Sequence, residues 1–471
     1  MKFRSTPLLL ALALGLSGRA PAQGLFTNLH SFVYTNGTGP VATLIAAGNT
    51  LYGTARTGGE NGFFSGYGSV FKINTDGFGF NVVRVFTNGP DGGNLESSLV
   101  LAGSTLYGPA AFGGASNHGT LFGINTNGTG LTNLFNFPAA SATFPYTNGP
   151  GTYPAAGLLL AGNTFYGSGN NGGAFGWGTI FAVNTNGSGF TNLHSFNFTD
   201  GQYPSAPLTL SSNLLYGTTA AGGANGIGAL FQLSTNGTGY TNFYSFSPPG
   251  GYPYTNSDGA SPLGSLVPLD GSLYGTASSG GSNACGTVFK VNPDGSGFTA
   301  LHQFGGMSGP QLTNSDGANP QSGLLLFSNQ LYGTAANGGK AGNGTVFQLN
   351  LDGSGFTTLY HFSDTNNPAG TNTDGAHPFG GLVQSGGMLF GTASAGGTAA
   401  YGTVFSLLPP PPLFITLNGT NVIVSWPTNV TSFSLQSNTN LLTTNWSAVS
   451  GQYAVTNPAT GKLKFYRLMH P

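Results

Sequence analysis

The sequence predicts an all-β protein: a seven-bladed β-propeller closed by an N-terminal strand and followed by a small β-sandwich. Three observations lead to this prediction. A four-strand unit recurs seven times along the chain. A strand that the last unit lacks is present at the N-terminus. A run of prolines separates the seventh unit from a short C-terminal segment of different composition.

The repeated unit is defined by three landmarks with fixed spacing. A Leu-Tyr-Gly tripeptide or a close variant opens it, a Gly-Gly pair follows seven residues later, and a phenylalanine ends a Gly-Thr-Val-Phe-like strand after that. The tripeptides start at Leu51, Leu106, Phe165, Leu215, Leu273, Leu331 and Leu389. The first copy carries a four-residue insertion in its Gly-Gly loop, so that its phenylalanine is Phe71.

The sixth unit illustrates the expected strands, at residues 323–327, 330–335, 344–349 and 355–362. Leu331 and Tyr332 point to opposite faces of their strand, yet both are large and apolar. Burial on both faces is expected in a propeller, where each sheet packs against two neighbours. Gly333 is expected where another backbone approaches closely.

The two ends of the repeat region predict ring closure. Residues 26–32 match the outer-strand segment 190–196, whereas the seventh unit passes from Leu408 directly into prolines. The N-terminal strand would therefore complete the last blade and remove a free sheet edge. An open β-solenoid is the structural alternative, and it would not need the displaced strand.

Residues 1–22 read as an export signal. Lys2 and Arg4 precede the apolar run 7–16, and Ala20-Pro21-Ala22 forms a small-residue cleavage site. Cleavage after Ala22 predicts an extracellular or cell-surface protein. No later segment has the length and apolarity of a membrane span, so none is expected in the mature chain.

The expected domains are the propeller at residues 23–408, a stiff proline linker at 409–412 and the β-sandwich at 413–471. Strands are expected in the sandwich at 421–426, 433–437, 446–453 and 464–468. Two of the three tryptophans fall in this segment, which is consistent with a small core.

Composition excludes several function classes. Only 5% of residues are charged and the net charge is −1, so there is no basic surface to neutralise phosphates, and nucleic-acid binding is not expected. Cys285 is the single cysteine, so no intramolecular disulfide can form.

The units of the form Leu-Tyr-Gly-Thr-Ala, Gly-Gly and Gly-Thr-Val-Phe resemble the GloVer tandem repeats of secreted environmental bacterial proteins, over about residues 24–408. The tail, with Ser425-Trp426-Pro427 and Phe465-Tyr466-Arg467-Leu468, resembles a fibronectin- or immunoglobulin-like β-sandwich appended to many such proteins. That resemblance implies an anchoring or sorting role for the tail. It implies a location and no activity.

Little in the sequence indicates catalysis. Glu60 and Glu96 are the two glutamates, and nine of the ten aspartates directly precede glycine, a dipeptide typical of turns. Three of the histidines, His30, His194 and His302, share a repeat position that holds phenylalanine, tyrosine or arginine in other units. No catalytic residue, metal ligand set or cofactor site is predicted. Calcium binding by the recurring Asn-Ser-Asp-Gly loops is less favoured than turn formation.

Function is expected on the face that holds the Gly-Gly loops and the long inter-blade connections. The candidate ligand residues there are Tyr146, Tyr153, Trp177, Tyr252 and Tyr254, which suit neutral polar ligands. The favoured interpretation is a non-enzymatic scaffold for adhesion that binds extracellular polysaccharide or a surface protein. The alternative is a polysaccharide lyase or hydrolase that uses a propeller face or channel.

Overall fold

A computed structural model of the protein describes residues 25–59, 66–251, 254–365 and 367–411, and six short strands between Phe414 and Met469. Across these described parts, the regular structure is β except for a single 3₁₀ turn, η1 (Tyr34–Asn36). The chain divides into one compact unit at Phe26–Leu408 and a second that contains Pro409–Pro471. The predicted export signal lies outside the described residues.

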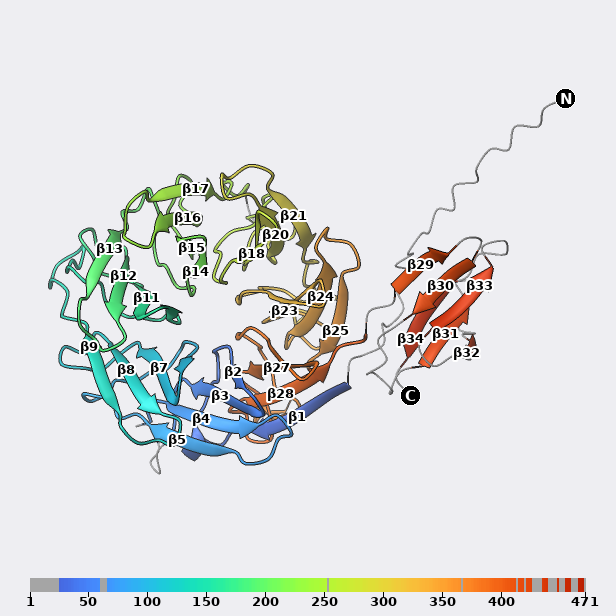
Figure 1. Ribbon diagram of the computed structural model, residues 1–471, viewed down its shortest axis with the longest axis horizontal. Coiled ribbons are helices and arrows are strands. Elements are labelled where there is room, and N and C mark those ends of the chain that lie inside the picture. Colours follow the sequence, from blue (N-terminus) through green and yellow to red (C-terminus); the bar gives the residue numbers. More distant parts are fainter. Residues whose placement is uncertain are drawn as a thin grey trace. The chain divides into compact units, whose positions relative to one another are not determined.

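The larger unit is a seven-bladed β-propeller, with seven four-stranded antiparallel sheets arranged in a ring (Figure 1). The first three sheets are β2 (Ile45–Ala47), β3 (Thr50–Ala55), β4 (Ser69–Asn74) and β5 (Asn81–Val85); β6 (Val100–Ala102), β7 (Thr105–Ala110), β8 (Thr120–Asn125) and β9 (Thr132–Asn136); and β10 (Leu159–Ala161), β11 (Thr164–Gly169), β12 (Thr179–Asn184) and β13 (Thr191–Ser195).

The next three sheets are β14 (Thr209–Ser211), β15 (Leu214–Thr219), β16 (Ala229–Ser234) and β17 (Thr241–Ser245); β18 (Val267–Leu269), β19 (Ser272–Ala277), β20 (Thr287–Val291) and β21 (Thr299–Gln303); and β22 (Leu325–Phe327), β23 (Gln330–Ala335), β24 (Thr345–Asn350) and β25 (Thr357–His361). Each expected strand of the sixth unit overlaps an observed one, and the ends differ by up to two residues.

The seventh sheet joins the two ends of the repeat region. Its strand order is β1 (Leu25–Ser31), β28 (Thr403–Leu408), β27 (Met388–Ala393) and β26 (Val383–Ser385), and β1 lies beside β28 in Figure 1. The amide of Phe32 donates a hydrogen bond to the carbonyl of Gly402 over 2.9 Å. Phe26 stacks on Tyr360 of the sixth sheet at a centroid distance of 3.9 Å.

Burial on both faces explains why the paired apolar residues recur. Leu331 and Tyr332 are 0% and 1% exposed although they point to opposite faces of β23. Tyr332 packs with Leu389 and Phe405 of the seventh sheet, whereas Leu331 packs with Val288 and Phe304 of the fifth. Each blade thus contributes to two hydrophobic clusters, one with each neighbour.

The glycine of the Leu-Tyr-Gly tripeptide has a different cause from the one expected. A Cβ at Gly333 would lie 2.5 Å from the ring carbon Cζ of Phe347 and 3.1 Å from a Leu324 methyl carbon. The neighbour that approaches this glycine is therefore the cross-strand phenylalanine ring, and the prediction of a close backbone was wrong. The glycine makes room for the phenylalanine that ends the following strand.

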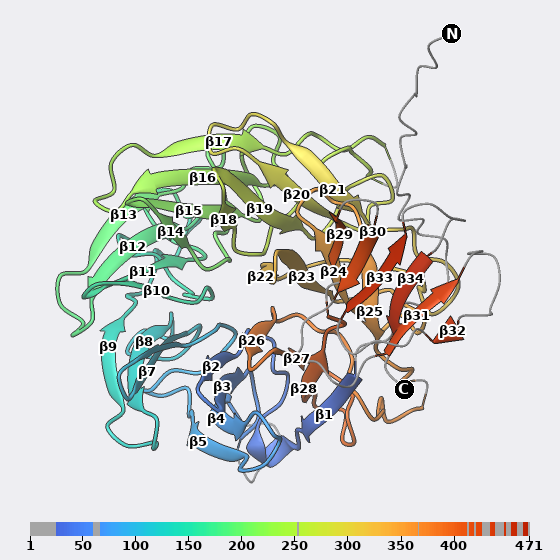
Figure 2. The same ribbon diagram turned by 45° about the vertical axis from the view of Figure 1, so that its right-hand side comes forward.

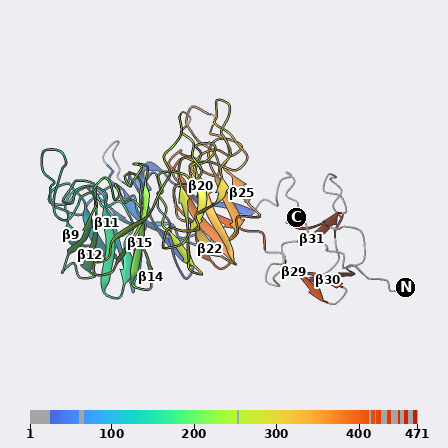
Figure 3. The ribbon, with the colours of Figure 1, turned by 90° about the horizontal axis from the view of Figure 1, so that it is seen from above.

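The two faces of the ring differ in loop length. One face carries short hairpin turns, such as the two-residue turn at Ser328 (φ 49°) and Asn329 (61°), which has the geometry of a type I′ turn. On the other face, each inter-blade connection forms a bridge to a Gly-Gly loop, as in Thr152 with Asn171 and Gln202 with Ala221. Seen from the side, long loops rise above the sheets on one face (Figure 3).

The centre of the ring is lined by the inner strands, such as β14, β22 and β26 (Figure 2). Short segments of small residues precede these strands and bond to the adjacent blade. The hydroxyl of Thr334 donates to the carbonyl of Gly380 over 3.0 Å, and that of Thr392 donates to Ala42 over 3.1 Å. The amide of Gly381 donates to the Thr43 hydroxyl over 2.9 Å. Small uncharged groups therefore form the contacts around the centre.

The second unit contains two three-stranded sheets. One has the order β29 (Phe414–Asn418), β30 (Asn421–Ser425), β33 (Ala454–Pro458), and the other β32 (Ser447–Ala448), β31 (Ser434–Asn438), β34 (Phe465–Met469). Val424 and Leu435, one in each sheet, are buried. The predicted strands overlap β30, β31, β32 and β34, whereas β29 and β33 were not predicted. Trp426 and Trp446 lie outside the described residues.

Among the described residues, no helix has the length and apolar character needed to cross a membrane.

Candidate functional site

A connected group of partly exposed aromatic side chains lies on the Gly-Gly-loop face, where the second, third and fourth blades meet. We call it the aromatic platform and define it as Phe144, Tyr146, Trp177, Phe198 and Tyr203. The ring of Phe144 contacts those of Tyr146 and Trp177 at centroid distances of 6.1 and 5.6 Å. Trp177 in turn contacts Phe198 at 6.0 Å and Tyr203 at 6.3 Å.

The platform is built from three separate loops. Phe144 and Tyr146 belong to the long connection after β9, and Trp177 belongs to the Gly-Gly loop of the third blade. Phe198 and Tyr203 belong to the connection after β13. Phe144 is 67% exposed, Tyr146 54% and Phe198 47%. Large apolar side chains are usually withdrawn from water, so a contiguous exposed group of them indicates an interaction surface.

Backbone hydrogen bonds fix the platform at the boundary between two blades. Tyr203 has a left-handed backbone conformation with φ of 58°. Its amide donates to the carbonyl of Trp177 over 3.1 Å, and its carbonyl accepts from the amide of Ala220 over 3.1 Å. Trp177 packs against the hydrophobic cluster of the third and fourth blades, which supports its indole from below.

The side-chain amide of Asn148 ties the long connection to the Gly-Gly loop. Its Oδ1 accepts from the amides of Gly151 and Gly173 at 2.8 and 3.1 Å, while its Nδ2 donates to the carbonyl of Pro138 at 3.0 Å. The same arrangement recurs at Asn256, Asn314 and Asn372. The segment that bears Phe144 and Tyr146 is thereby held to the scaffold.

Tyr153 belongs to a second aromatic group one blade boundary away. Its ring contacts Phe112 at 5.1 Å and His118 at 5.6 Å, and its φ is 54°. Among the predicted ligand residues, the structure thus brings Tyr146 and Trp177 into one group and Tyr153 into a neighbouring one.

Tyr254 lies on the connection after the fourth blade and is 63% exposed. The platform residues belong to the earlier connections, after β9 and β13, and to the Gly-Gly loop between β11 and β12. Tyr252 lies outside the described residues.

Sequence reasoning missed Phe144, Phe198, Tyr203, Phe112 and His118 as members of these groups. A signal for them was present: each is an aromatic residue in a loop on the face expected to carry function. Because the connections differ in length and composition, the repeat did not reveal that these residues meet.

Most of the Asp-Gly aspartates fall into two kinds. Asp76, Asp294 and Asp352 are turn residues whose carboxylates accept from backbone amides two residues later. Hydrogen bonds from Ser296 lower the pKa of Asp294, and those from Ser354 lower the pKa of Asp352. The aspartates of the second kind also bond to a side chain of the outer strand.

The second kind of aspartate anchors the outer strand to the connection that follows it. Asp258 accepts from the Tyr244 hydroxyl over 2.7 Å, and Asp374 from the Tyr360 hydroxyl over 2.7 Å. The pairs His194–Asp200 and His302–Asp316 have the same arrangement, with Nε2–Oδ2 distances of 3.2 and 3.0 Å. Each carboxylate also accepts a backbone amide, from Asn197, Ser247, Gly305 or Ser363.

The shared outer-strand position has a packing role. His30, His194 and His302 stack on Phe80, Tyr240 and Phe356 of the next blade at 3.5, 3.7 and 3.5 Å. Burial lowers the pKa of His30 to about 4, which keeps its imidazole neutral near pH 7. Burial, followed by the hydrogen bonds to Asp258 and Asp374, raises the pKa of Tyr244 and Tyr360.

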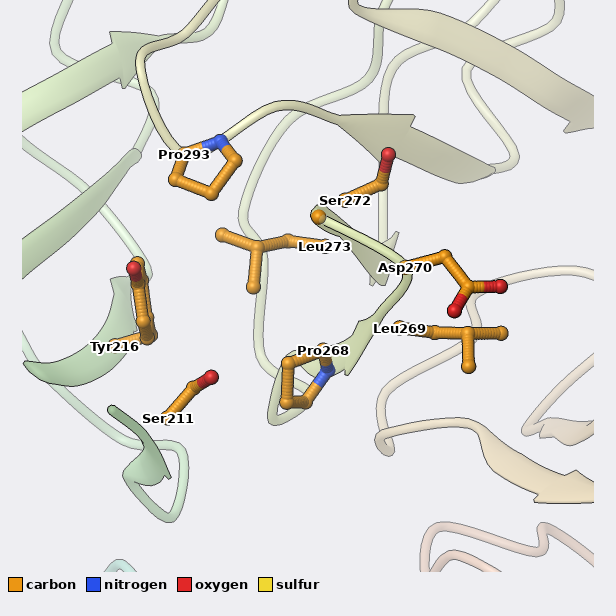
Figure 4. Close-up of a pocket in the computed structure, with 9 residues that line it drawn as sticks. Ser211, Tyr216, Pro268, Leu269, Asp270, Ser272, Leu273 and Pro293 are labelled. Carbon is orange, nitrogen blue, oxygen red and sulfur yellow. The ribbon is translucent and has the colours of Figure 1, made fainter. Parts of the chain in front are cut away.

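One pocket lies on the opposite face, between the fourth and fifth blades (Figure 4). It has a volume of about 180 Å³ and is lined by Ser211, Tyr216, Pro268, Leu269, Asp270, Gly271, Ser272, Leu273 and Pro293. Ligand pockets commonly enclose about 300–1,000 Å³, so this one is small for an organic substrate. In Figure 4, Tyr216 and Asp270 lie on opposite sides of it.

Over the described parts of the chain, no three His, Cys, Asp or Glu side chains come together in a way that could hold a metal ion. Cys285 is buried, and burial raises the pKa of its thiol. The arrangement with the clearest capacity for binding is therefore the aromatic platform.

Family comparison agrees with the tandem units. The chain matches the Gloeobacter/Verrucomicrobia repeat model over residues 19–149, 141–312 and 252–455. It belongs to that repeat family. No curated protein matches the chain.

Solved structures give distant likenesses. The chain is similar to an oligogalacturonate lyase in complex with manganese, with 10% identity, 83% of this chain and 99% of the other covered, and a TM-score of 0.49. It is also similar to a chain of a nidogen/laminin complex (14% identity, 61% and 84% covered, TM-score 0.37) and to TolB from Acinetobacter baumannii (11%, 62% and 59%, 0.36). With identities and scores this low, nothing about activity follows from them.

Proposed function

We propose that this protein is an exported, non-enzymatic propeller scaffold that binds polysaccharide at the cell surface or outside the cell through the aromatic platform. The observation that carries the proposal is the exposure of Phe144, Tyr146 and Phe198 around a partly exposed Trp177, on loops anchored to a rigid ring. Aromatic rings provide large, stiff apolar surfaces on which the C–H faces of sugars can stack.

The rigidity of the scaffold supports this role. The left-handed backbone of Tyr203 and the amide clamp of Asn148 hold the platform loops before any ligand arrives. Preorganisation of this kind lowers the entropic cost of binding. The position of β1 beside β28 supports a ring closed by the N-terminal strand, and the two C-terminal sheets support a β-sandwich. The anchoring or sorting role proposed for that sandwich rests on its resemblance to the tails of similar exported proteins.

The test is affinity electrophoresis of the full chain in gels that contain soluble polysaccharides, with Trp177→Ala and Phe144→Ala as variants. Truncation of a central aromatic contact typically costs about 2 kcal/mol, or roughly a 30-fold loss of affinity. Phe144 is the more exposed of the two, so Phe144→Ala leaves the fold intact even if Trp177→Ala loosens the core below it.

Tyr401→Ala provides a matched control. Tyr401 occupies the repeat position of Trp177 in the seventh blade, is 38% exposed and contacts Tyr34 at 6.0 Å. It should retain the binding of the parent chain. If the platform instead binds another copy of the chain, light scattering should show that the parent protein self-associates and that Phe144→Ala does not. In that case no polysaccharide should retard the protein in the gel.

A further inference from the structure

The blades that carry the platform form a nearly uncharged sector of the protein. From Val85 to Phe289 the sequence contains no lysine and no arginine. Between Glu96 and Asp258, a span that includes every platform residue, Asp200 is the only acidic residue. Polysaccharides that carry carboxylates or sulfates are normally bound by arginine or lysine, which this sector lacks.

The one carboxylate of the sector is occupied by protein donors. Asp200 lies 3.2 Å from Nε2 of His194 and accepts from the backbone amide and side-chain Nδ2 of Asn197 at 2.9 and 3.1 Å. Its backbone carbonyl accepts from the Tyr240 hydroxyl over 2.8 Å. Asp200 therefore serves the blade boundary, where protein donors occupy its carboxylate.

Most cationic side chains of the ring are engaged elsewhere. Arg56 forms an ion pair with Glu96 at 2.9 Å, Arg84 lies 3.6 Å from Asp91, and Lys290 lies over the Tyr274 ring at 5.6 Å. Lys340, in the Gly-Gly loop of the sixth blade, is exposed. These groups belong to the first, fifth and sixth blades, whereas the platform lies on loops of the second to fourth.

We infer that the platform is selective for uncharged polysaccharides, whose apolar C–H faces stack on its rings, and that it discriminates against uronate-containing or sulfated chains. This inference rests on the proposed function and names the substrate class of the same site. Burying a polar group without a partner is costly, and burying an unpaired carboxylate costs far more. A uronate stacked on the platform would lose hydration without gaining a cationic partner, whereas a neutral sugar keeps its hydroxyls at the solvent edge.

The experiment is affinity electrophoresis of the full chain with hydroxyethyl cellulose and galactomannan as neutral probes, and polygalacturonate and alginate as acidic probes. Each gel is run at low and at near-molar salt. We expect retardation by at least one neutral probe, unchanged by salt because no counterions are released. Phe144→Ala should raise the apparent Kd more than tenfold, whereas Lys340→Ala should leave it unchanged.

The outcomes separate the two claims. Retardation by an acidic probe alone, lost at high salt or in Lys340→Ala, would overturn the selectivity and leave polysaccharide binding in place. Retardation by a neutral probe that survives both Phe144→Ala and Trp177→Ala would remove the platform as the site. Failure of all four probes to retard the chain would refute polysaccharide binding and the selectivity together.

Discussion

Replacement of Phe26 by alanine tests whether the N-terminal strand closes the ring. Phe26 contacts three rings, at 3.9 Å from Tyr360, 5.2 Å from Phe405 and 5.7 Å from Phe362. Aromatic pairs contribute about 0.5–1.5 kcal/mol each beyond area burial, and Phe→Ala in a full core costs about 3–5 kcal/mol. Because Phe26 is partly exposed, we expect the free energy of unfolding to fall by about 2–4 kcal/mol.

The repeat supplies a matched control within the chain. Phe190 holds the same position in the third blade, where chain continuity fixes the strand, and contacts Phe135, Phe181 and Phe137 at 4.0, 5.2 and 6.0 Å. The assay is urea unfolding of the full chain, monitored by circular dichroism. If β1 completes the seventh blade, Phe26→Ala and Phe190→Ala should lower the urea midpoint by similar amounts. A normal midpoint for Phe26→Ala beside a lowered one for Phe190→Ala would refute closure by β1.

Three further predictions concern the ring. Gly333→Ala should destabilise the protein by about 1–3 kcal/mol, because the new methyl group meets a phenyl ring at 2.5 Å, whereas Gly149→Ala, with open space around it, should be nearly neutral in the same denaturation assay. Thr334→Val should cost about 1–2 kcal/mol by leaving a buried carbonyl unpaired; an unchanged midpoint would show that this hydroxyl does not join the blades. As the pH falls from 6.5 towards 4, protons bind His30 in the unfolded chain first, so the melting temperature should fall. The melting temperature of the His30→Phe variant should fall less steeply over this pH range. Equal slopes of melting temperature against pH for the variant and the parent chain would count against burial of His30 as the cause.

The repeat made the strand pairing and the burial pattern of the blades predictable from the sequence. Strand pairing and two-sided burial depend on residues close in the chain, such as Leu331 and Tyr332, and seven copies of the same spacing reinforce one another. The reason for the glycine at position 333 was not predictable in the same way, because either a nearby aromatic ring or a nearby backbone segment would exclude a larger residue. Only the structure, which places Phe347 across the strand pair, distinguishes these two causes.

The loops were harder to predict for a different physical reason. The sequence favoured a turn role for Asp258 and Asp374, but not their contacts with Tyr244 and Tyr360, which lie fourteen residues earlier. His302 and Asp316 share this fourteen-residue spacing, so the sequence held a signal for the contact. The spacing is not general, because the connections vary in length and His194 lies only six residues before Asp200. The same variability concealed that Phe144 meets Trp177.

One repeat position shows where the chain departs from what the fold alone needs. A residue with left-handed backbone joins each pair of neighbouring blades, and its φ lies between 51° and 60° in all seven copies: Gly39, Asn94, Tyr153, Tyr203, Ser261, Asn319 and His377. In each copy its amide and carbonyl bond to flanking segments, so the backbone alone performs the joining role.

Glycine adopts this conformation without steric cost, and asparagine tolerates it, whereas a bulky side chain is strained there. Tyrosine nonetheless occupies the position at two adjacent boundaries, where Tyr153 contacts Phe112 and His118 and Tyr203 contacts Trp177. Strained residues of this kind persist where their side chains serve a purpose that the backbone cannot. His377 fills the same position between the sixth and seventh blades, where its Nδ1 lies 3.0 Å from the carbonyl of Ala336, so a bulky residue here can also serve the blade boundary. The rings of the two tyrosines join the aromatic groups on loops of the second to fourth blades, which accords with the proposed platform.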